Sequence, residues 1–278
     1  MSNLNLKVLD DTSPTRKMAM GTWKTVGDPS VYGLMEVDMS QVLKVLPDYE
    51  KKHGLKITPS HLVGKAMAYC MKLRPEINGM IRGSRIYLRE DVTLFYQVNL
   101  PGNGKDTVKM ATLSGTTIPK AETLKLHEIA EALSQKVKAA RAGEDREIAD
   151  NLKVFKYLPW WMSRFYLNIG SWLIYGLNLN MSFLGLPRDP FGSVMITNIG
   201  SLGIDVAWAP LCPYSRVPLL ITVGAINDKP VAIEGKVAIR AILPIAVTFD
   251  HRLIDGIHAA QMARDFKKCF SEPEVYLL

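Results

Sequence analysis

Two patterns of apolar and polar positions divide the chain into elements. Short runs rich in β-branched and aromatic residues predict strands, which cover 31–38, 85–90, 92–100, 107–114, 193–199, 217–226, 236–242 and 243–250. Longer stretches with apolar residues three or four positions apart predict helices, which cover 40–54, 58–73, 121–148 and 256–270. Strands and helices mix without a regular βαβ rhythm. The pattern therefore favours an α+β layered sheet over a doubly wound nucleotide-binding fold.

The two early helices carry start signals in their sequences. Ser40 is available as the N-cap of the first, and Pro59 suits the first turn of the second. The second helix is also expected to bury one face, because apolar residues recur along it at helical spacing: Leu62, Val63, Ala66, Met67 and Cys70.

Residues 154–187 differ in character from the rest of the chain. They are aromatic and apolar, with no charged residue between Arg164 and Arg188. The uncharged part approaches the length of a membrane span, but asparagines and glycines interrupt it. Two interpretations stand about equal: an amphipathic segment at a membrane surface or over an apolar pocket, and burial against another subunit. A transmembrane helix ranks third.

Composition and charge narrow the range of partners. Hydrophobic residues make up 47% and charged residues 22%, as in a folded soluble protein, and the net charge of +7 favours anionic partners. Nucleic acid is not expected, since Lys and Arg are scattered among carboxylates without a dense basic run. The fragment PGNGK lacks the spacing of a phosphate-binding loop.

The cysteines and the N-terminus bear on location. Cys70, Cys212 and Cys269 form no CxxC pair, so neither a disulfide framework nor a zinc site is expected, and no other metal site is predicted. A reducing cytosol fits these thiols, and the first residues lack the pattern of a secretory signal. The expected location is cytoplasmic, with membrane association through residues 154–187 as an alternative.

The segment FDHRLIDG lies where an apolar strand ends and the last helix begins. A histidine at such a junction is positioned by the sheet and can still face a cleft. His251 occupies this place, and Asp255 four residues later can support the turn. By itself a His-Asp pair is more often structural than catalytic.

The similarity of several segments to a known family makes a catalytic role more convincing. DHRLIDG resembles the HxxxDG active-site signature of the chloramphenicol acetyltransferase and dihydrolipoamide acyltransferase superfamily. MITNIGSLGID, VPLLITVGAI, RPEINGMIRGSRIYLREDV and the final EPEVYLL resemble further segments of the catalytic domain of 2-oxo acid dehydrogenase acyltransferases. The resemblance spans about residues 12 to 278 and implies one acyltransferase domain over 1–278, with a mixed sheet packed with helices and a trimeric assembly.

The resemblance also assigns chemistry to particular residues. His251 would be the general base that takes the proton from the attacking thiol of coenzyme A or dihydrolipoamide. A thiol has a pKa of about 8.5 and an imidazole about 6.5, so neutral histidine can generate the thiolate near neutral pH. Thr197 would donate a hydrogen bond to the oxyanion of the thioester carbonyl. The expected activity is acyl transfer between coenzyme A and a thiol acceptor such as dihydrolipoamide, with Thr197 facing His251 of a neighbouring subunit.

Further residues are assigned supporting roles. Asp255 belongs with His251 and Thr197 to the catalytic set, and together with Arg252 it would hold the His251 turn by ion pairing or hydrogen bonding. Asn198 and Gly256 would give structural support. From the residues alone, Thr197 could equally be an ordinary strand residue followed by a turn. His258 is expected to be structural, and the remaining histidines are expected at the surface or in packing: His53, His61 and His127. No residue is assigned to the binding of coenzyme A.

The sequence departs from the family in three respects. No lipoyl domain or peripheral-subunit-binding domain is evident, so a lipoyl group would come from another chain. The segment KDTVKMATL replaces the usual Gly-Leu-Ile-Thr-Pro, so acyl specificity cannot be carried over, and residues 154–187 look like an insertion. Two other functions therefore stay open: a non-catalytic trimeric core or scaffold, and an acyltransferase for a hydrophobic alcohol or amine.

The last four residues, Val275 to Leu278, are apolar. In the resembling core proteins such a tail bridges trimers, which suggests a larger cage. The alternative is that the tail folds back on its own subunit.

Overall fold

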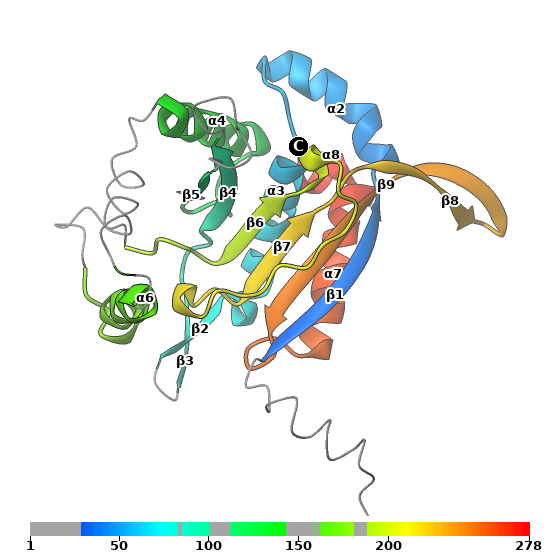
Figure 1. The fold of residues 1–278 in the computed structure, drawn as a ribbon. Helices are drawn as coiled ribbons and strands as arrows, with labels where there is room; N and C mark the ends of the chain where they lie inside the picture. Colours follow the sequence, from blue (N-terminus) through cyan, green and yellow to red (C-terminus); the bar gives the residue numbers. More distant parts are fainter. Residues whose placement is uncertain (1–28, 83–84, 101–111, 143–158, 160–161, 181–187) are drawn as a thin grey trace, which may run out of the picture.

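A computed structural model gives the arrangement of the chain (Figure 1). The described residues are 29–82, 85–100, 112–142, 159, 162–180 and 188–278. Within them one sheet has the order β1-β9-β7-β6-β4-β5, and β8 pairs with β9 beside this path. The strands of the sheet are β1 Ser30–Asp38, β4 Leu94–Leu100, β5 Thr112–Ile118, β6 Val194–Asn198, β7 Leu219–Val223, β8 Asn227–Ile233 and β9 Lys236–Asp250.

The sheet is mixed. β6 runs parallel to both β4 and β7, and the other neighbouring pairs are antiparallel. The helices are α2 Ser40–His53, α3 Pro59–Leu73, α4 Leu126–Ala142, α6 Ser163–Ser171, α7 Gly256–Ser271 and α8 Pro273–Tyr276. α3 and α7 pack together against one face of the sheet, and α4 packs beside β4 and β5. The predicted α+β fold with a mixed sheet is confirmed.

α3 shows why the apolar periodicity was informative. The residues that predicted its buried face are all buried in the core that α3 shares with the sheet and α7: Leu62, Val63, Ala66, Met67 and Cys70. Cys70 also lies against Cys269 of α7, and both are free thiols. A hydrogen bond with Cys269, together with burial, raises the pKa of Cys70 well above its usual value.

The C-terminal third differs from the prediction in two places. Residues 236–242 and 243–250 form the single strand β9, because its register with β1 continues without a break across Pro244. β8 was not predicted, since Pro230 and charged residues dilute its apolar pattern. The turn to β9 is made by Glu234 and Gly235, both with positive φ, as a two-residue β-hairpin requires.

Some boundaries and one small sheet also differ. Ser40 is not the N-cap of α2: Met39 takes that position, and the Ser40 N–H donates to Asp38 Oδ1 at 2.8 Å. α4 begins at Leu126, five residues later than expected, and residues 143–148 lie outside the described ranges. Residues 107–111 of another predicted strand also lie outside them. The expected strand at 85–90 appears as β3 Arg85–Leu88, which pairs with an unpredicted strand, β2 Gly79–Arg82.

The apolar C-terminus packs on its own subunit. Leu277 is buried in the core, and Tyr276 and Leu278 pack against that core. The Tyr276 ring lies 5.1 Å from that of Tyr69 on α3. Val275 alone in this tail is well exposed, at 70%. The geometry of the single subunit therefore accounts for most of the tail.

Candidate active site

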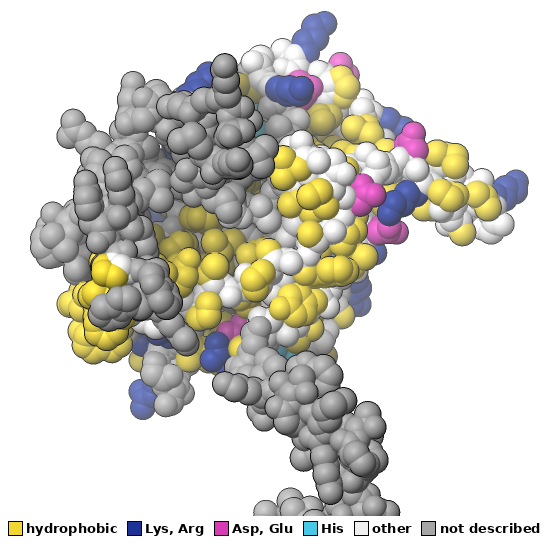
Figure 2. Space-filling view, in the orientation of Figure 1, with side chains coloured by type: hydrophobic (Ala, Val, Ile, Leu, Met, Phe, Trp, Pro, Cys, Tyr) yellow, Lys and Arg dark blue, Asp and Glu magenta, His cyan; other side chains and the backbone are white. Residues whose placement is uncertain are grey.

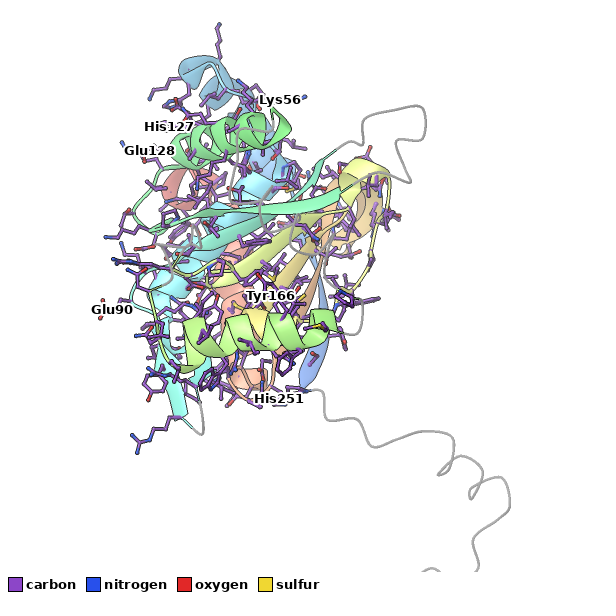
Figure 3. The ribbon with its side chains drawn as sticks, turned by 60° about the vertical axis from the view of Figure 1, so that its left-hand side comes forward. Lys56, Glu90, His127, Glu128, Tyr166 and His251 are labelled. Carbon is purple, nitrogen blue, oxygen red and sulfur yellow. The ribbon has the colours of Figure 1, made fainter. Side chains whose placement is uncertain are left out.

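The His251 turn joins β9 to α7. Asp250, the last residue of β9, is buried. Its carboxylate receives three hydrogen bonds from the Arg252 side chain and one from the Arg252 backbone N–H, at 2.6 to 3.2 Å. The His251 N–H donates to the Pro29 carbonyl at 2.9 Å. The Arg252–Asp250 pair and the backbone hydrogen bonds thus fix the turn, and the His251 side chain is exposed at the edge of the subunit (Figure 3).

Asp255 supports the same turn from the helix side. It is the N-cap of α7: its Oδ1 accepts from the N–H groups of Ile257 at 2.9 Å and His258 at 3.0 Å. His258 Nδ1 accepts from the Asp255 N–H and completes a capping box. The hydrogen bond from the His258 backbone is the main reason that the pKa of Asp255 is lowered, and His251 nearby contributes.

Arg252 and Asp255 both hold this turn, each through its own partner. Arg252 pairs with Asp250, which the sequence reasoning did not single out, and Asp255 acts on the backbone of α7. Gly256 is the first residue of α7 and has open space around it, so the structure shows no steric need for glycine there.

Thr197 lies near the end of β6, half-buried. Its neighbour Asn198 is held on two sides: Asn198 Nδ2 donates to Ser60 Oγ of α3 at 2.9 Å, and the Ser201 N–H donates to Asn198 Oδ1 at 3.1 Å. Gly200 follows, where a Cβ atom would lie 2.2 Å from the Gly224 carbonyl oxygen. The end of β6 is thus fixed against both α3 and β7.

A cavity of about 510 Å³ opens beside Thr197. The ladder between β4 and β6 ends at Tyr96 and Ile196 while both strands continue, so the cavity lies where they part. The buried Tyr96 hydroxyl on its wall has no hydrogen-bond partner among the described residues. A Cβ atom on Gly64 would lie only 1.8 Å from that hydroxyl.

His61 lines this cavity as a packed residue, which is one of the two places expected for it. It is buried near the start of α3, where its Nδ1 accepts from the Thr58 N–H at 3.1 Å. Burial lowers its pKa to about 4, so it is neutral at neutral pH. The signal in the sequence was its position three residues after the N-cap Thr58, where a capping box places a side chain.

Replacing His61 by glutamine is expected to make folding less sensitive to acid. Glutamine keeps the capping pattern but does not titrate. In the wild type the unfolded chain binds a proton at His61 below its normal pKa of about 6.5, whereas the folded chain does so only near 4, so stability falls as pH falls between these values. Between about pH 7 and about pH 4.5, the free energy of unfolding of the wild type therefore falls by roughly 2 to 3 kcal/mol through His61. Urea unfolding at both pH values would measure it, and equal pH dependence of the two proteins would contradict it.

His53 and His127 pack against each other. The rings of His53 at the end of α2 and His127 at the start of α4 stack with centroids 4.0 Å apart, and the Tyr49 hydroxyl lies 2.9 Å from His127 Nδ1. Within the described ranges, no three His, Cys, Asp or Glu side chains come together as a metal site.

The structure does not bring His251 and Thr197 together within one subunit. In register, Thr197 pairs with Thr222, and Thr222 pairs with Ala246 of β9. His251 lies five residues beyond Ala246, which is about 16 Å along the strand. β6 and β9 run in opposite directions, so the two residues belong to opposite ends of the sheet.

The mixed sheet, with the HxxxDG turn at one end and the Thr197 strand end at the other, agrees with the resemblance to acyltransferase catalytic domains. The chain matches the family described as 2-oxoacid dehydrogenases acyltransferase (catalytic domain) over residues 13–147 and 191–278, and it belongs to this family. The unmatched residues 148–190 contain the stretch interpreted as an insertion.

Curated relatives agree with the family. The acetyltransferase component of the acetoin cleaving system of Bacillus subtilis is 27% identical over 232 residues, covering 84% of this chain and 46% of the relative. The succinyltransferase component of the 2-oxoglutarate dehydrogenase complex of Rickettsia bellii is 25% identical over 250 residues, covering 87% and 49%. The chain thus spans about half the length of these relatives.

Solved structures show the same fold. A probable dihydrolipoamide acetyltransferase from Listeria monocytogenes superposes with a TM-score of 0.63 at 17% identity, covering 96% of this chain and 95% of its own. The cubic core of the pyruvate dehydrogenase multienzyme complex gives a TM-score of 0.63 at 20% identity, covering 91% and 85%.

Proposed function

We propose that this protein moves an acyl group between coenzyme A and a thiol acceptor such as dihydrolipoamide. His251 takes the proton of the attacking thiol, the thiolate sulfur bonds to the thioester carbonyl carbon, and Thr197 donates a hydrogen bond to the resulting oxyanion. The original carbon-sulfur bond then breaks, and His251 returns the proton to the departing thiolate. The relatives support this, since they are named as dihydrolipoyllysine-residue acetyltransferases and succinyltransferases.

The observation that carries the proposal is the position of the two residues at opposite ends of one sheet. A base and an oxyanion donor must both lie within hydrogen-bond reach of one thioester, which the separation of about 16 Å along β9 prevents inside a subunit. A cyclic assembly solves this, because each interface can pair the His251 end of one subunit with the Thr197 end of the next. The assembly proposed is a trimer, with a cage of trimers as a further step.

Similar residue types have been studied in a protein of the same fold. In the dihydrolipoamide acetyltransferase of Azotobacter vinelandii, a serine, a histidine and an asparagine have been investigated for roles in the catalytic mechanism. Thr197 supplies the hydroxyl of such a set here, His251 the imidazole, and Asp255 the third side chain. Asp255 in place of an asparagine keeps the acceptor that caps α7.

The cavity beside Thr197 fits the proposed substrate. Its volume of about 510 Å³ leaves room for a thioester arm. Lys56 and Lys138 on its walls carry the positive charge that the phosphate groups of coenzyme A would need. The acceptor thiol would come from a lipoyl group carried by a separate protein.

Mixing two inactive variants tests the shared site. In trimers assembled from equal amounts of His251→Ala and Thr197→Ala subunits, about a quarter of the interfaces combine an intact His251 with an intact Thr197. We expect acyl transfer from acetyl-coenzyme A to dihydrolipoamide to recover to about a quarter of the wild-type rate after the subunits are unfolded and refolded together.

Each variant refolded alone and then mixed is the control, since it allows no exchange of subunits. A co-refolded sample no more active than this control, with trimers present by mass, would overturn the shared site. Wild-type protein that folds and assembles but transfers no acyl group from several acyl-coenzyme A donors would instead favour a non-catalytic scaffold.

A further inference from the structure

Residues 162–180 form a separate feature beside the sheet, which we call the aromatic unit. It consists of α6, the π-helical turn Trp172–Gly176 and the residues that follow. It lies within the part of the chain that the family does not match, residues 148–190. The mechanism proposed above uses none of its side chains, so its apolar character needs another explanation.

The inner side of the aromatic unit is held to the body of the protein by polar contacts. The buried Tyr175 hydroxyl donates to Asp189 Oδ1 at 2.9 Å, and Arg89 Nε donates to Oδ2 of the same carboxylate at 2.8 Å. Arg82 Nε donates to the Gly176 carbonyl at 2.7 Å. These contacts fix which side of the unit faces outward.

The outer side is apolar. Phe165, Ile169 and Trp172 are 63%, 41% and 53% exposed, and their spacing of four and then three residues places them in one stripe along the helix. Leu177 and Leu179 continue as exposed apolar residues at the end of the unit. Figure 2 shows hydrophobic side chains gathered at the position of α6, and we call this stripe with its two leucines the apolar face.

The neighbouring hairpin of β2 and β3 extends this character. Arg82, at the end of β2, contacts the aromatic unit, and its guanidinium lies over the Tyr87 ring of β3 at 5.5 Å. Ile86 and Leu88 of β3 are 56% and 54% exposed. Aliphatic and aromatic residues next to arginines are the composition of a membrane-surface segment.

The sequence that contains the aromatic unit is basic, and exposed arginines lie on its described flanks. From residue 151 to residue 188 the sequence has basic residues and no acidic residue, and both Arg85 and Arg188 are exposed. Asp189, the acidic residue that follows, is already bonded to Arg89 and Tyr175. A second copy of the same face would bring like charges together, whereas a surface of negative charge would complement them.

No helix in the described ranges has the length and apolar character to cross a bilayer. An apolar stripe on a helix of nine residues, flanked by cations, suits a position at the level of the lipid headgroups. We propose that the apolar face docks the protein on an anionic lipid bilayer. Phe165, Ile169 and Trp172 enter the boundary between headgroups and acyl chains, and the neighbouring arginines pair with lipid phosphates. This binding site lies apart from acyl transfer and does not depend on it.

Vesicle sedimentation tests the docking. Wild-type protein is expected to sediment with vesicles of phosphatidylcholine and phosphatidylglycerol, less with phosphatidylcholine alone, and less when salt is raised. The double variant Phe165→Ser with Trp172→Ser is expected to bind the anionic vesicles at least about tenfold more weakly, because two large apolar side chains no longer leave water. Leu43→Ser on α2, an exposed leucine outside the apolar face, is the matched control and is expected to bind as the wild type does.

Two further measurements keep the result decisive. Solution mass and acyl transfer to soluble dihydrolipoamide are both expected to be unchanged in the double variant. Equal sedimentation of wild type and double variant, or no binding by the wild type, would overturn the proposal. If the double variant formed a smaller assembly in solution, a second copy would cover the apolar face and the proposal would be wrong. If neither the wild type nor the variants transferred acyl groups, the proposed function would be wrong and the docking proposal would stand.

Discussion

Replacing His251 by alanine is expected to lower turnover by roughly two to four orders of magnitude, the usual loss when a general base is removed. The fold should survive, because alanine retains the backbone N–H that bonds to the Pro29 carbonyl. Its side chain is exposed at the end of β9 and packs into no core. Steady-state rates with acetyl-coenzyme A and dihydrolipoamide would measure the loss, and circular dichroism would establish that the variant is folded.

His258 provides the matched control for that variant. It belongs to the same turn, but its role is to accept a hydrogen bond from the Asp255 backbone at the start of α7. Glutamine at this position preserves a capping box, so His258→Gln is expected to keep near wild-type turnover. Normal turnover in His251→Ala would contradict the mechanism, and equal losses in both variants would point to disruption of the turn.

Local patterns in the sequence predicted the parts of the fold that local chemistry decides. The apolar spacing in α3 marked its buried face, since a helix packed on a sheet must bury one stripe. The apolar run before His251 marked the end of β9 in the same way. Turn and capping signals were harder to use: the pair Glu234–Gly235 makes the hairpin to β9, yet Pro230 and the charges of β8 concealed the strand before it.

Long-range contacts account for what the sequence did not predict about the site. Arg252 was assigned to the His251 turn, but its partner Asp250 depends on how β9 ends. His61 lines the cavity with Thr197 only because α3 and β6 meet there. The hydrogen bond between Asn198 and Ser60, which are 138 positions apart in the chain, shows this contact. The separation of Thr197 from His251 follows from strand order, which the patterns of single elements do not contain.

The aromatic unit illustrates the same limit. Its sequence left burial against another subunit and contact with a membrane surface about equal. The contacts of Tyr175 and Gly176 with the body of the protein separate an inner side from an outer one. That distinction gives the vesicle experiment particular residues to change.

Replacing Thr197 by alanine is expected to lower turnover about a hundredfold or more, with little change in the Michaelis constant. The hydroxyl is assigned to the oxyanion, which exists only in the transition state and the tetrahedral intermediate, so the ground state loses little binding. The strand end should keep its shape, because Asn198 remains bonded to Ser60 and Ser201. Rates over a range of acyl-coenzyme A concentrations would separate turnover from the Michaelis constant.

Two further substitutions distinguish the hydroxyl from the shape of the strand. Thr197→Ser keeps the donor and is expected to retain most of the turnover. Thr222→Val changes the residue directly paired with Thr197, and its buried Oγ1 has no hydrogen-bond partner among the described residues, so valine is expected to leave turnover unchanged and stability equal or slightly higher. If Thr197→Ala raised only the Michaelis constant, Thr197 would be a binding residue. If Thr222→Val lost as much turnover as Thr197→Ala, the effect would belong to the strand pair, and the oxyanion role would be wrong.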